Sequence, residues 1–202
     1  MTGQNPWDQR YSGDTFYYGT DPNDFLRDHT TAFPAGGELL SLAEGEGRNA
    51  VFLARQGFRV TGVDGSAVGL AKARGLAAKE GVPLETVVAD LATFDLGVAR
   101  WDGIVSIWCH LPPPLRATLH PRLLAALRPG GVLLLEHYHP RQLGYGTGGP
   151  PSAELMMTLE ELGRAFPGLE RLHAFEGERD VHEGGGHEGK SFVTRFLARK
   201  PA

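Results

Sequence analysis

The stretch Leu39-Leu40-Ser41-Leu42-Ala43-Glu44-Gly45-Glu46-Gly47-Arg48-Asn49-Ala50 decides the fold of this chain, together with Asp64 at the end of Phe58-Arg59-Val60-Thr61-Gly62-Val63. The pattern predicts an apolar strand, a Gly-x-Gly turn, a helix and a second strand that ends in a carboxylate. Glycines at 45 and 47 allow a tight turn and let backbone N–H groups approach a ligand closely. Asp64 follows Gly45 by 19 residues, where an acidic side chain can accept hydrogen bonds from both ribose hydroxyls of a nucleotide-like cofactor.

The composition of the chain favours a single globular domain and argues against several classes of binding partner. The chain has 202 residues, 41% of them hydrophobic, which suits one globular domain with a sizeable core. Its net charge of −4 gives no electrostatic case for binding nucleic acid or an anionic membrane. Cys109 is the single cysteine, so no internal disulfide forms. With neither a signal-peptide pattern nor an apolar run near the ~20 residues that span a bilayer, we expect a cytoplasmic monomer or small homo-oligomer.

From Glu38 onward, apolar runs alternate with helical patterns. Strands are predicted over 39–43, 58–63, 84–88, 101–107 and 132–138, and helices over 49–56 and 67–80. Ser66 is the expected N-cap of the second helix and Gly81 its stop. Residues 112–127 read as helical but broken, since Pro121 is expected to begin a second short helix. The alternation predicts an α/β fold with helices on both faces of a mostly parallel sheet.

The last third has a different pattern. A helix is predicted over 154–166, a strand over 169–176 and a final strand over 191–199 that turns back through glycines 184–186. This strand is expected to lie antiparallel beside 132–138, giving a seven-stranded sheet, while 141–152 forms a long loop. We therefore expect one domain over 1–202, with a leader or lid (1–33), a cofactor-binding core (38–138) and substrate-side loops with a C-terminal antiparallel hairpin (139–202).

The glycine motif alone leaves the cofactor open, because Gly45-x-Gly47-x-x-Ala50 also fits the dinucleotide fingerprint. Three features favour S-adenosylmethionine (SAM). Asp90 follows the strand 84–88, where it can accept a hydrogen bond from the adenine amine. The turn Leu127-Arg128-Pro129-Gly130-Gly131 is common in methyltransferases that use SAM. A chain of 202 residues also leaves no room for the catalytic domain that most nicotinamide enzymes add.

Residues 38–138 resemble a class I SAM-dependent methyltransferase with a Rossmann-like fold. The closer likeness is to the small bacterial tellurite-resistance and thiopurine methyltransferases, through Glu44-Gly-Glu-Gly-Arg-Asn-Ala50, Val60-Thr-Gly-Val-Asp-Gly-Ser66, Trp7-Asp-Gln-Arg-Tyr11 and Tyr18-Gly19. After about residue 140 only the general layout matches. The resemblance implies cofactor contacts from Glu44, Gly45 and Gly47 on the methionine side, Asp64 on the ribose, Gly65 and Ser66 at the edge, Asp90 and Leu91 at adenine, and Ile107 on the floor. Asn49 is a further expected cofactor contact.

One position departs from the family pattern. Members usually read Asp-x-Gly-x-Gly, whereas this chain has Ser41-x-Ala43-x-Gly45. The usual aspartate helps to hold the loop and the methionine ammonium. We expect Glu44, next to the turn, to supply the charge that is missing at position 41.

Methyl transfer from a sulfonium is an in-line displacement that requires alignment of the acceptor and exclusion of water. A thiol or a metalloid anion needs no base, whereas a neutral amine or hydroxyl needs one within hydrogen-bond reach. We expect His110, His139 and Tyr18 to be the catalytic residues, because they lie at predicted strand ends and in the leader. Further candidates are Trp108, Cys109, His137, Tyr138, Tyr11, Tyr17, Arg179, His182 and His187. Cys109 is expected to pack as a small apolar group.

Two apparent motifs are rejected. Residues 184–191 match the phosphate-loop expression, but the residues that follow alternate like a strand, whereas that loop must precede a helix. His182 and His187 are separated by glycines at a spacing unsuited to one helix face, so we predict no metal site. The sequence thus favours a SAM-dependent methyltransferase acting on a small molecule, for example a thiol or a metalloid anion, and leaves open whether the acceptor atom is sulfur, nitrogen, oxygen or a metalloid. The alternatives are a nicotinamide oxidoreductase and a non-catalytic SAM-binding module.

Overall fold

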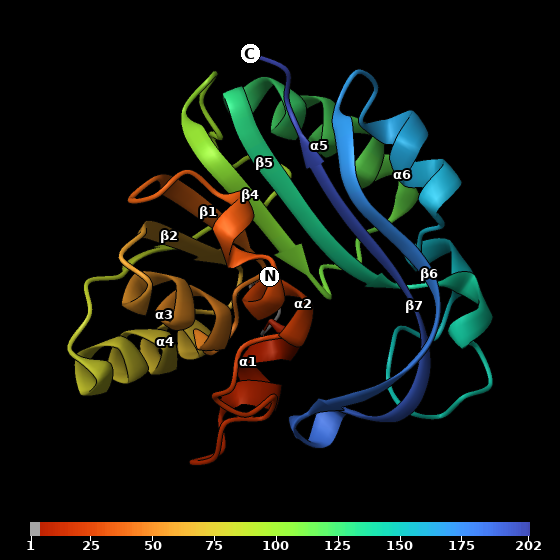
Figure 1. Ribbon diagram of the computed structural model, residues 1–202. Coiled ribbons are helices and arrows are strands. Elements are labelled where there is room, and N and C mark those ends of the chain that lie inside the picture. Colours follow the sequence, from red (N-terminus) through yellow and green to blue (C-terminus); the bar gives the residue numbers. More distant parts are fainter. Residues whose placement is uncertain (1–4) are drawn as a thin grey trace.

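A seven-stranded β-sheet forms the centre of the molecule over residues 5–202, which are the residues that the computed structural model describes (Figure 1). The strands lie in the order β3-β2-β1-β4-β5-β7-β6. Strands β1 to β5 pair in parallel, and β7 runs antiparallel between β5 and β6. The predicted α/β architecture, with an antiparallel last strand beside the fifth, is confirmed.

The strands are β1 (Glu38–Leu42), β2 (Arg59–Asp64), β3 (Glu85–Val88), β4 (Trp101–Ile107), β5 (Leu127–Tyr138), β6 (Glu170–Glu183) and β7 (His187–Arg199). The α-helices are α1 (Pro6–Tyr11), α2 (Asp24–Asp28), α3 (Arg48–Arg55), α4 (Ala67–Glu80), α5 (Pro113–Ala126) and α6 (Leu159–Ala165). Short 3-10 helices are η1 (Thr30–Ala32), η2 (Pro140–Gln142), η3 (Ala153–Leu155) and η4 (Gly184–Gly186).

The central strands are buried on both faces, as a parallel sheet covered by helices requires. In β1, Leu39 packs with residues of α2 and α3, while its neighbour Leu40 packs with residues of α5 and α6. Strand β5 alternates in the same way, with Leu134 on the first face and Leu133 on the second. Figure 1 shows the two helix layers on opposite sides of the sheet.

The expected break at Pro121 is wrong, because α5 runs without interruption through this residue. Proline removes one backbone hydrogen bond and costs about 3 kcal/mol inside a helix. Leu119 and Leu123, on either side of Pro121, are 1% and 2% exposed and belong to the core. Burial of such leucine side chains contributes about 1.5–3 kcal/mol each, which offsets the cost of the proline.

The region after residue 139 departs from expectation in two places. The predicted helix 154–166 is split into η3 and α6, because Thr158 caps α6 through a reciprocal capping box with Glu161. The last two strands are longer than predicted, pairing from Glu170↔Arg199 as far as Glu183↔His187. Charged residues such as Arg179 and Glu183 fall inside this extension, so its polar sequence concealed its strand character. As expected, Ser191 lies on a strand and begins no helix, and Lys190 belongs to the same strand.

The leader is docked on the rest of the domain. The ammonium of Lys72, in α4, donates to the backbone carbonyls of Gly13 (2.8 Å) and Thr15 (2.6 Å). Tyr17 N–H donates to Glu46 (2.7 Å), a residue of the glycine turn. The leader prediction included residues 1–4, which lie outside the described residues. Its described part crosses in front of the sheet, as Figure 1 shows.

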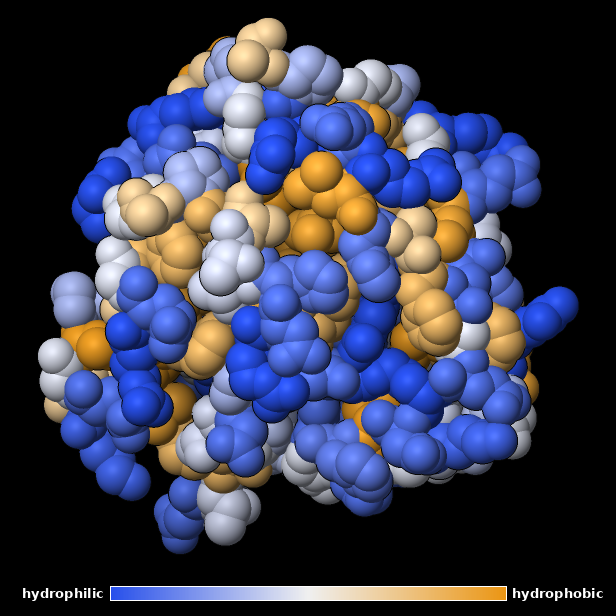
Figure 2. All heavy atoms as spheres, in the orientation of Figure 1, coloured by the Kyte–Doolittle hydropathy of each residue, from blue (hydrophilic) through white to orange (hydrophobic). Residues whose placement is uncertain are grey.

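The outer surface is mainly hydrophilic on the face shown in Figure 2, with hydrophobic residues in smaller areas between charged ones. The exposed large hydrophobic side chains come from separate segments, namely Trp7, Tyr17, Val88, Val98, Leu143 and Leu172. Within residues 5–202, the helices are too short or too polar to cross a membrane. In the same part of the chain, His, Cys, Asp and Glu side chains form no group of three or more that could hold a metal ion.

Candidate active site

The Gly-x-Gly turn joins β1 to α3 in a backbone conformation that favours glycine. Gly45 and Gly47 have φ angles of 61° and 97°, and Gly47 is the N-cap of α3. Ala43, at the start of the turn, has a φ of 50°, which is costly for a residue with a Cβ. The family pattern has glycine at this position, so the chain accommodates the same bend with a small side chain.

Asp64 connects the turn to the second strand. Its Oδ2 accepts a hydrogen bond from Gly45 N–H (2.9 Å), and its Oδ1 accepts one from Ser66 N–H (2.7 Å). The side chain is 7% exposed, and burial raises the pKa of this carboxyl, although the two backbone donors oppose the shift. Ser66 caps α4 through Gly69 N–H (3.0 Å), as predicted, and donates to Asp8 of the leader (2.5 Å).

A cavity of about 990 Å³ opens at the carboxyl ends of β1, β2 and β4, between the two halves of the sheet. Ligands bind at this switch point in open α/β sheets. Of the predicted cofactor residues, Glu44, Asn49, Asp64, Gly65, Asp90, Leu91 and Ile107 line the cavity. Gly45 and Ser66 act through the backbone bonds to Asp64, and Gly47 packs against α4. The leader contributes Trp7, Arg10, Tyr11, Tyr17 and Tyr18 to the cavity lining.

The three predicted catalytic residues have different environments. His110 lines the cavity, but its Nε2 accepts a hydrogen bond from Tyr138 N–H (3.2 Å), and burial lowers its pKa to about 3. Tyr18 also lines the cavity, and its hydroxyl accepts a hydrogen bond from Arg10 (3.3 Å). His139 lies outside the cavity lining: its Nδ1 accepts a bond from Arg141 N–H (3.0 Å), and its Nε2 is 3.5 Å from Glu176.

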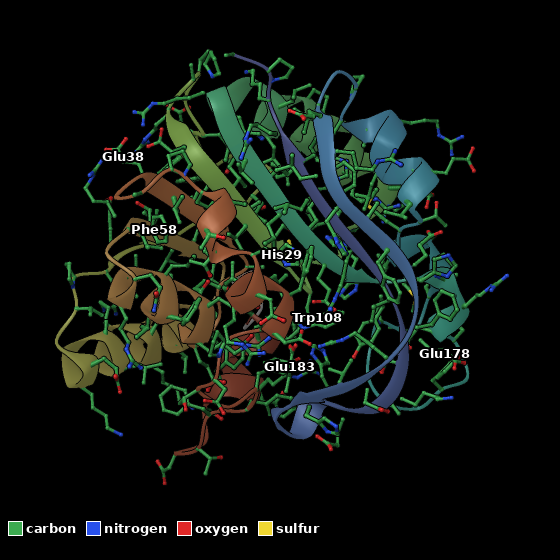
Figure 3. All side chains as sticks on the ribbon, viewed as in Figure 1. His29, Glu38, Phe58, Trp108, Glu178 and Glu183 are labelled. Atoms are coloured by element: carbon green, nitrogen blue, oxygen red, sulfur yellow. The ribbon has the colours of Figure 1, made fainter. Side chains whose placement is uncertain are left out.

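Cys109 is 4% exposed, and burial raises the pKa of its thiol to about 12. The thiol therefore stays protonated near neutral pH, which matches the expected packing role. Its neighbour Trp108 has a left-handed backbone (φ 55°), an unusual conformation for a bulky residue. The Trp108 indole stacks on Tyr138, with 4.4 Å between ring centroids, and donates to Glu183 (2.5 Å). Figure 3 shows Trp108 and Glu183 side by side.

On the inner side of the cavity, sequence reasoning missed Arg48 and Glu183, whereas His187 was among its further candidates. Arg48 of α3 and His187 of β7 both line it, and each faces Glu183 of β6. Glu183 and His187 could have been brought together by the register of the hairpin, since they pair with each other across the turn that η4 forms. The sequence pattern was considered only for His182 and His187 as metal ligands, and Glu183 was not singled out.

Comparison with known proteins agrees with this geometry. Residues 39–131 match the family model described as a methyltransferase domain, a span that includes the glycine turn, Asp64 and Asp90. A structure solved for the conversion of a disulfide bond into a thioacetal group during echinomycin biosynthesis is 21% identical, with a TM-score of 0.77, covering 96% of this chain and 90% of that one. TehB from Haemophilus influenzae is 20% identical, with a TM-score of 0.72 and coverage of 96% and 65%.

A third structure is the Burkholderia thailandensis 1,6-didemethyltoxoflavin-N1-methyltransferase with bound 1,6-didemethyltoxoflavin and S-adenosylhomocysteine. It is 22% identical with a TM-score of 0.62, and the match covers 88% of this chain and 75% of that one. No curated protein matches the chain in sequence. Residues 39–131 therefore form a methyltransferase domain, and the whole chain has the fold of SAM-dependent methyltransferases. The expected likeness to the tellurite-resistance group is confirmed by TehB, and the nicotinamide alternative is not supported.

The residues of this methyltransferase fit its cofactor. A carboxylate offers about four acceptor positions, so Asp64 keeps two for ribose hydroxyls after binding the two backbone donors. A Cβ on Gly45 would lie 2.7 Å from the Tyr11 hydroxyl, so the turn leaves no space there for a larger residue. When bound, SAM supplies a methyl group activated by its sulfonium. The residues of the turn would hold the cofactor, and leader residues line the same cavity.

Glu44 of the methyltransferase is held in the turn on both sides. Ser41 Oγ donates to one carboxylate oxygen, and Ala50 N–H donates to the other (2.9 Å). Burial raises the pKa of Glu44 to about 7, although these hydrogen bonds oppose the shift. Glu44 therefore holds the loop, and its negative charge develops as the pH rises through neutrality.

This titration predicts a pH-dependent cofactor affinity. If the ionised form of Glu44 attracts the methionine ammonium, the Kd for SAM should fall by up to about tenfold between about pH 6 and pH 8. Glu44→Gln should abolish this dependence, since an amide does not titrate. Isothermal titration calorimetry at several pH values measures both, with Glu160→Gln as an exposed control. Retention of the full pH dependence by Glu44→Gln would rule the role out.

A second prediction about the turn concerns the effect of replacing Gly47 on the stability of the protein. An added Cβ would lie 2.6 Å from both Cα and Cβ of Ala73, so α3 and α4 would have to separate. We expect Gly47→Ala to lower the free energy of unfolding by about 2–4 kcal/mol, through overpacking and a positive φ. Gly57→Ala isolates the conformational part, because Gly57 has a φ of 87° and nothing within 4 Å of its added Cβ. Equal losses in urea denaturation would show that packing on Ala73 is unimportant.

Proposed function

We propose that this methyltransferase acts on a small molecule bound in the inner part of the cavity, beyond the glycine turn. The observation that carries the proposal is the lining there, which combines Trp108 and Leu111 after β4 with Pro151 and Leu155 from the loop after β5. The leader closes the opposite side with Tyr17 and Tyr18. An apolar compartment with a few polar groups, covered from two sides, suits a small acceptor better than a macromolecule.

The charges of the lining favour a thiol over a metalloid anion. Over the described residues, the cavity is lined by four carboxylates (Glu44, Glu46, Asp64 and Asp90) and two guanidinium groups (Arg10 and Arg48). Arg48 is paired with Glu183 and Glu46 with Lys72, so three carboxylates and one guanidinium group remain. An oxyanion such as tellurite would lose its hydration among more negative than positive groups, which is costly. An uncharged, weakly acidic thiol avoids this cost.

A product assay tests the proposal. The purified protein is incubated with SAM and, in turn, benzyl mercaptan, 4-nitrothiophenol, a phenol, a heteroaromatic amine and tellurite, and methylated products are identified by mass spectrometry. We expect methylation of a thiol and loss of SAM binding in Asp64→Ala. Methylation of tellurite with no thiol turned over would overturn the proposed acceptor. We also propose that the protein is cytoplasmic and is a monomer or a small homo-oligomer. Light scattering measures the mass of the particle in solution.

A further inference from the structure

A second polar group lies beside the cavity, away from the glycine turn. It consists of Glu183 at the end of β6 and His187 at the start of β7, each 6% exposed. The Nδ1 atom of His187 is buried without a hydrogen-bond partner among the described residues, and it lies 4.0 Å from Oε2 of Glu183. Contacts between catalytic groups are commonly long before substrate binds, so this distance is compatible with a functional His–carboxylate pair.

Glu183 is fixed by donors from three segments. Asn23 of the leader donates to its Oε1 (2.8 Å), while Trp108 (2.5 Å) and Arg48 donate to its Oε2. Burial alone would raise the pKa of Glu183, but Arg48 and the hydrogen bonds outweigh it and lower that pKa well below its usual range. The carboxylate is therefore ionised and immobile beside the His187 ring.

The imidazole of His187 is held by aromatic rings. Its centroid lies 4.7 Å from that of Tyr18, 4.9 Å from that of Trp108 and 5.3 Å from that of Tyr138. With Nδ1 on the side of Glu183, Nε2 is at the opposite side of the ring, and the residue lines the cavity. This differs from His110, whose Nε2 is occupied by a backbone N–H.

We propose that His187 is the base that takes the proton of the methyl acceptor, and that Glu183 is the positioning residue that keeps the ring in its Nδ1–H form. This inference rests on the proposed function and deepens it, because it requires an acceptor that is still protonated when it binds, such as a thiol. The acceptor's lone pair forms the bond to the methyl carbon while the carbon–sulfur bond breaks and its electron pair stays on sulfur. The proton moves from the acceptor to Nε2 of His187 and then to water.

The charges around His187 are compatible with this role. Burial lowers the pKa of His187, and Glu183 partly opposes this shift. The imidazole is thus neutral near physiological pH and free to accept a proton. The titratable and charged groups that face it are Arg10, Tyr18, Arg48, His110, Tyr138 and Glu183.

Two thiols of different acidity separate base catalysis from binding. Near neutral pH, benzyl mercaptan is protonated and needs a base, whereas 4-nitrothiophenol is already ionised. His187→Gln should lower kcat/KM for benzyl mercaptan by about 10²–10⁴-fold and that for 4-nitrothiophenol by less than about tenfold. His182→Gln is the matched control, because His182 lies on the same hairpin with its side chain 69% exposed, and both rates should be unchanged. Equal losses on the two thiols in His187→Gln would overturn the proposal.

A measurement of the His187 tautomer decides the point independently of turnover. Nitrogen-15 NMR, with the His187 signals assigned by their loss in His187→Gln, should show the neutral Nδ1–H form, and Glu183→Gln should lose this preference. A proton on Nε2 in the wild-type protein would overturn the inference. If wild type methylates neither thiol, it is the proposed function that fails, and the tautomer alone decides whether the pair is arranged as inferred.

Discussion

Glu136→Gln is expected to lower the free energy of unfolding by about 3–5 kcal/mol. Glu136 is fully buried on β5, where its Oε1 accepts from Arg195 (3.0 Å) and Arg179 (3.2 Å). Its Oε2 accepts from Asn23 (2.8 Å). An amide of the same shape removes the negative charge but leaves two guanidinium groups in place. Both still contact the half-buried Asp24, and Arg179 also lies 4.0 Å from Glu183.

The large effect comes from an uncompensated charge. Burial raises the pKa of Glu136, although Arg195 and Arg179 oppose this shift. Removing one member of a buried ion pair costs far more than the pair itself contributes, because the remaining ions cannot recover their hydration. Urea denaturation measures the loss, and Glu178→Gln is the control, since its pair with Lys190 is exposed and should not alter the midpoint. A change as small for Glu136→Gln as for the control would contradict this account.

His137→Leu is expected to make the protein less sensitive to acid. His137 is 2% exposed on β5, and neither ring nitrogen has a hydrogen-bond partner. Burial, followed by His110, His120 and Arg116, holds the pKa of His137 well below its usual range. Below about pH 6.5 the unfolded chain therefore binds a proton that the folded protein does not. This residue destabilises the fold by about 1.4 kcal/mol per pH unit as the pH falls.

The prediction compares the stability of His137→Leu with that of wild type at two pH values. Near pH 7 the variant should match wild type within about 1 kcal/mol, since leucine replaces a buried polar ring that makes no hydrogen bonds. The difference in the free energy of unfolding between the variant and wild type should shift by about 2 kcal/mol in favour of the variant when the pH is lowered from 7 to 5. Urea denaturation at both pH values gives the comparison, and exposed His182→Ala should show no such difference. A constant difference between His137→Leu and wild type would show that His137 titrates normally.

The cofactor half of the site could be predicted because its determinants are local. The strand before Gly45, the turn itself and the strand that ends at Asp64 lie within one βαβ unit, and each has its own periodicity or turn residue. Ser66 likewise predicts the start of a helix, because its N-cap hydrogen bond joins it to a residue only three positions away. Such features follow from short-range rules.

The inner half could not be predicted, because its contacts join residues far apart in sequence. Asn23 and Glu183 are separated by 160 residues, and Asp24 and Arg195 by 171. No periodicity links such pairs, and a charged residue on a strand is more often exposed. The predicted helix break at Pro121 was wrong for a related reason. Burial of the flanking leucines, which depends on tertiary packing, outweighs the local helix-breaking effect of proline. The role of Glu46 in anchoring the leader was hidden in the same way, because its partners Lys72 and Tyr17 lie outside the turn.

The ion cluster also has a consequence for folding cooperativity. The β6–β7 hairpin brings Arg179, Glu183 and Arg195, a net charge of +1, while Asp24, Arg48 and Glu136 arrive from α2, α3 and β5. The complete cluster is neutral, and removal of Asp24, Arg48 or Glu136 alone leaves a net charge of one unit. An intermediate that lacks any one of the single charges would retain an unbalanced ion in a dry interior, so its population is suppressed. The leader should thus melt together with the sheet in one transition.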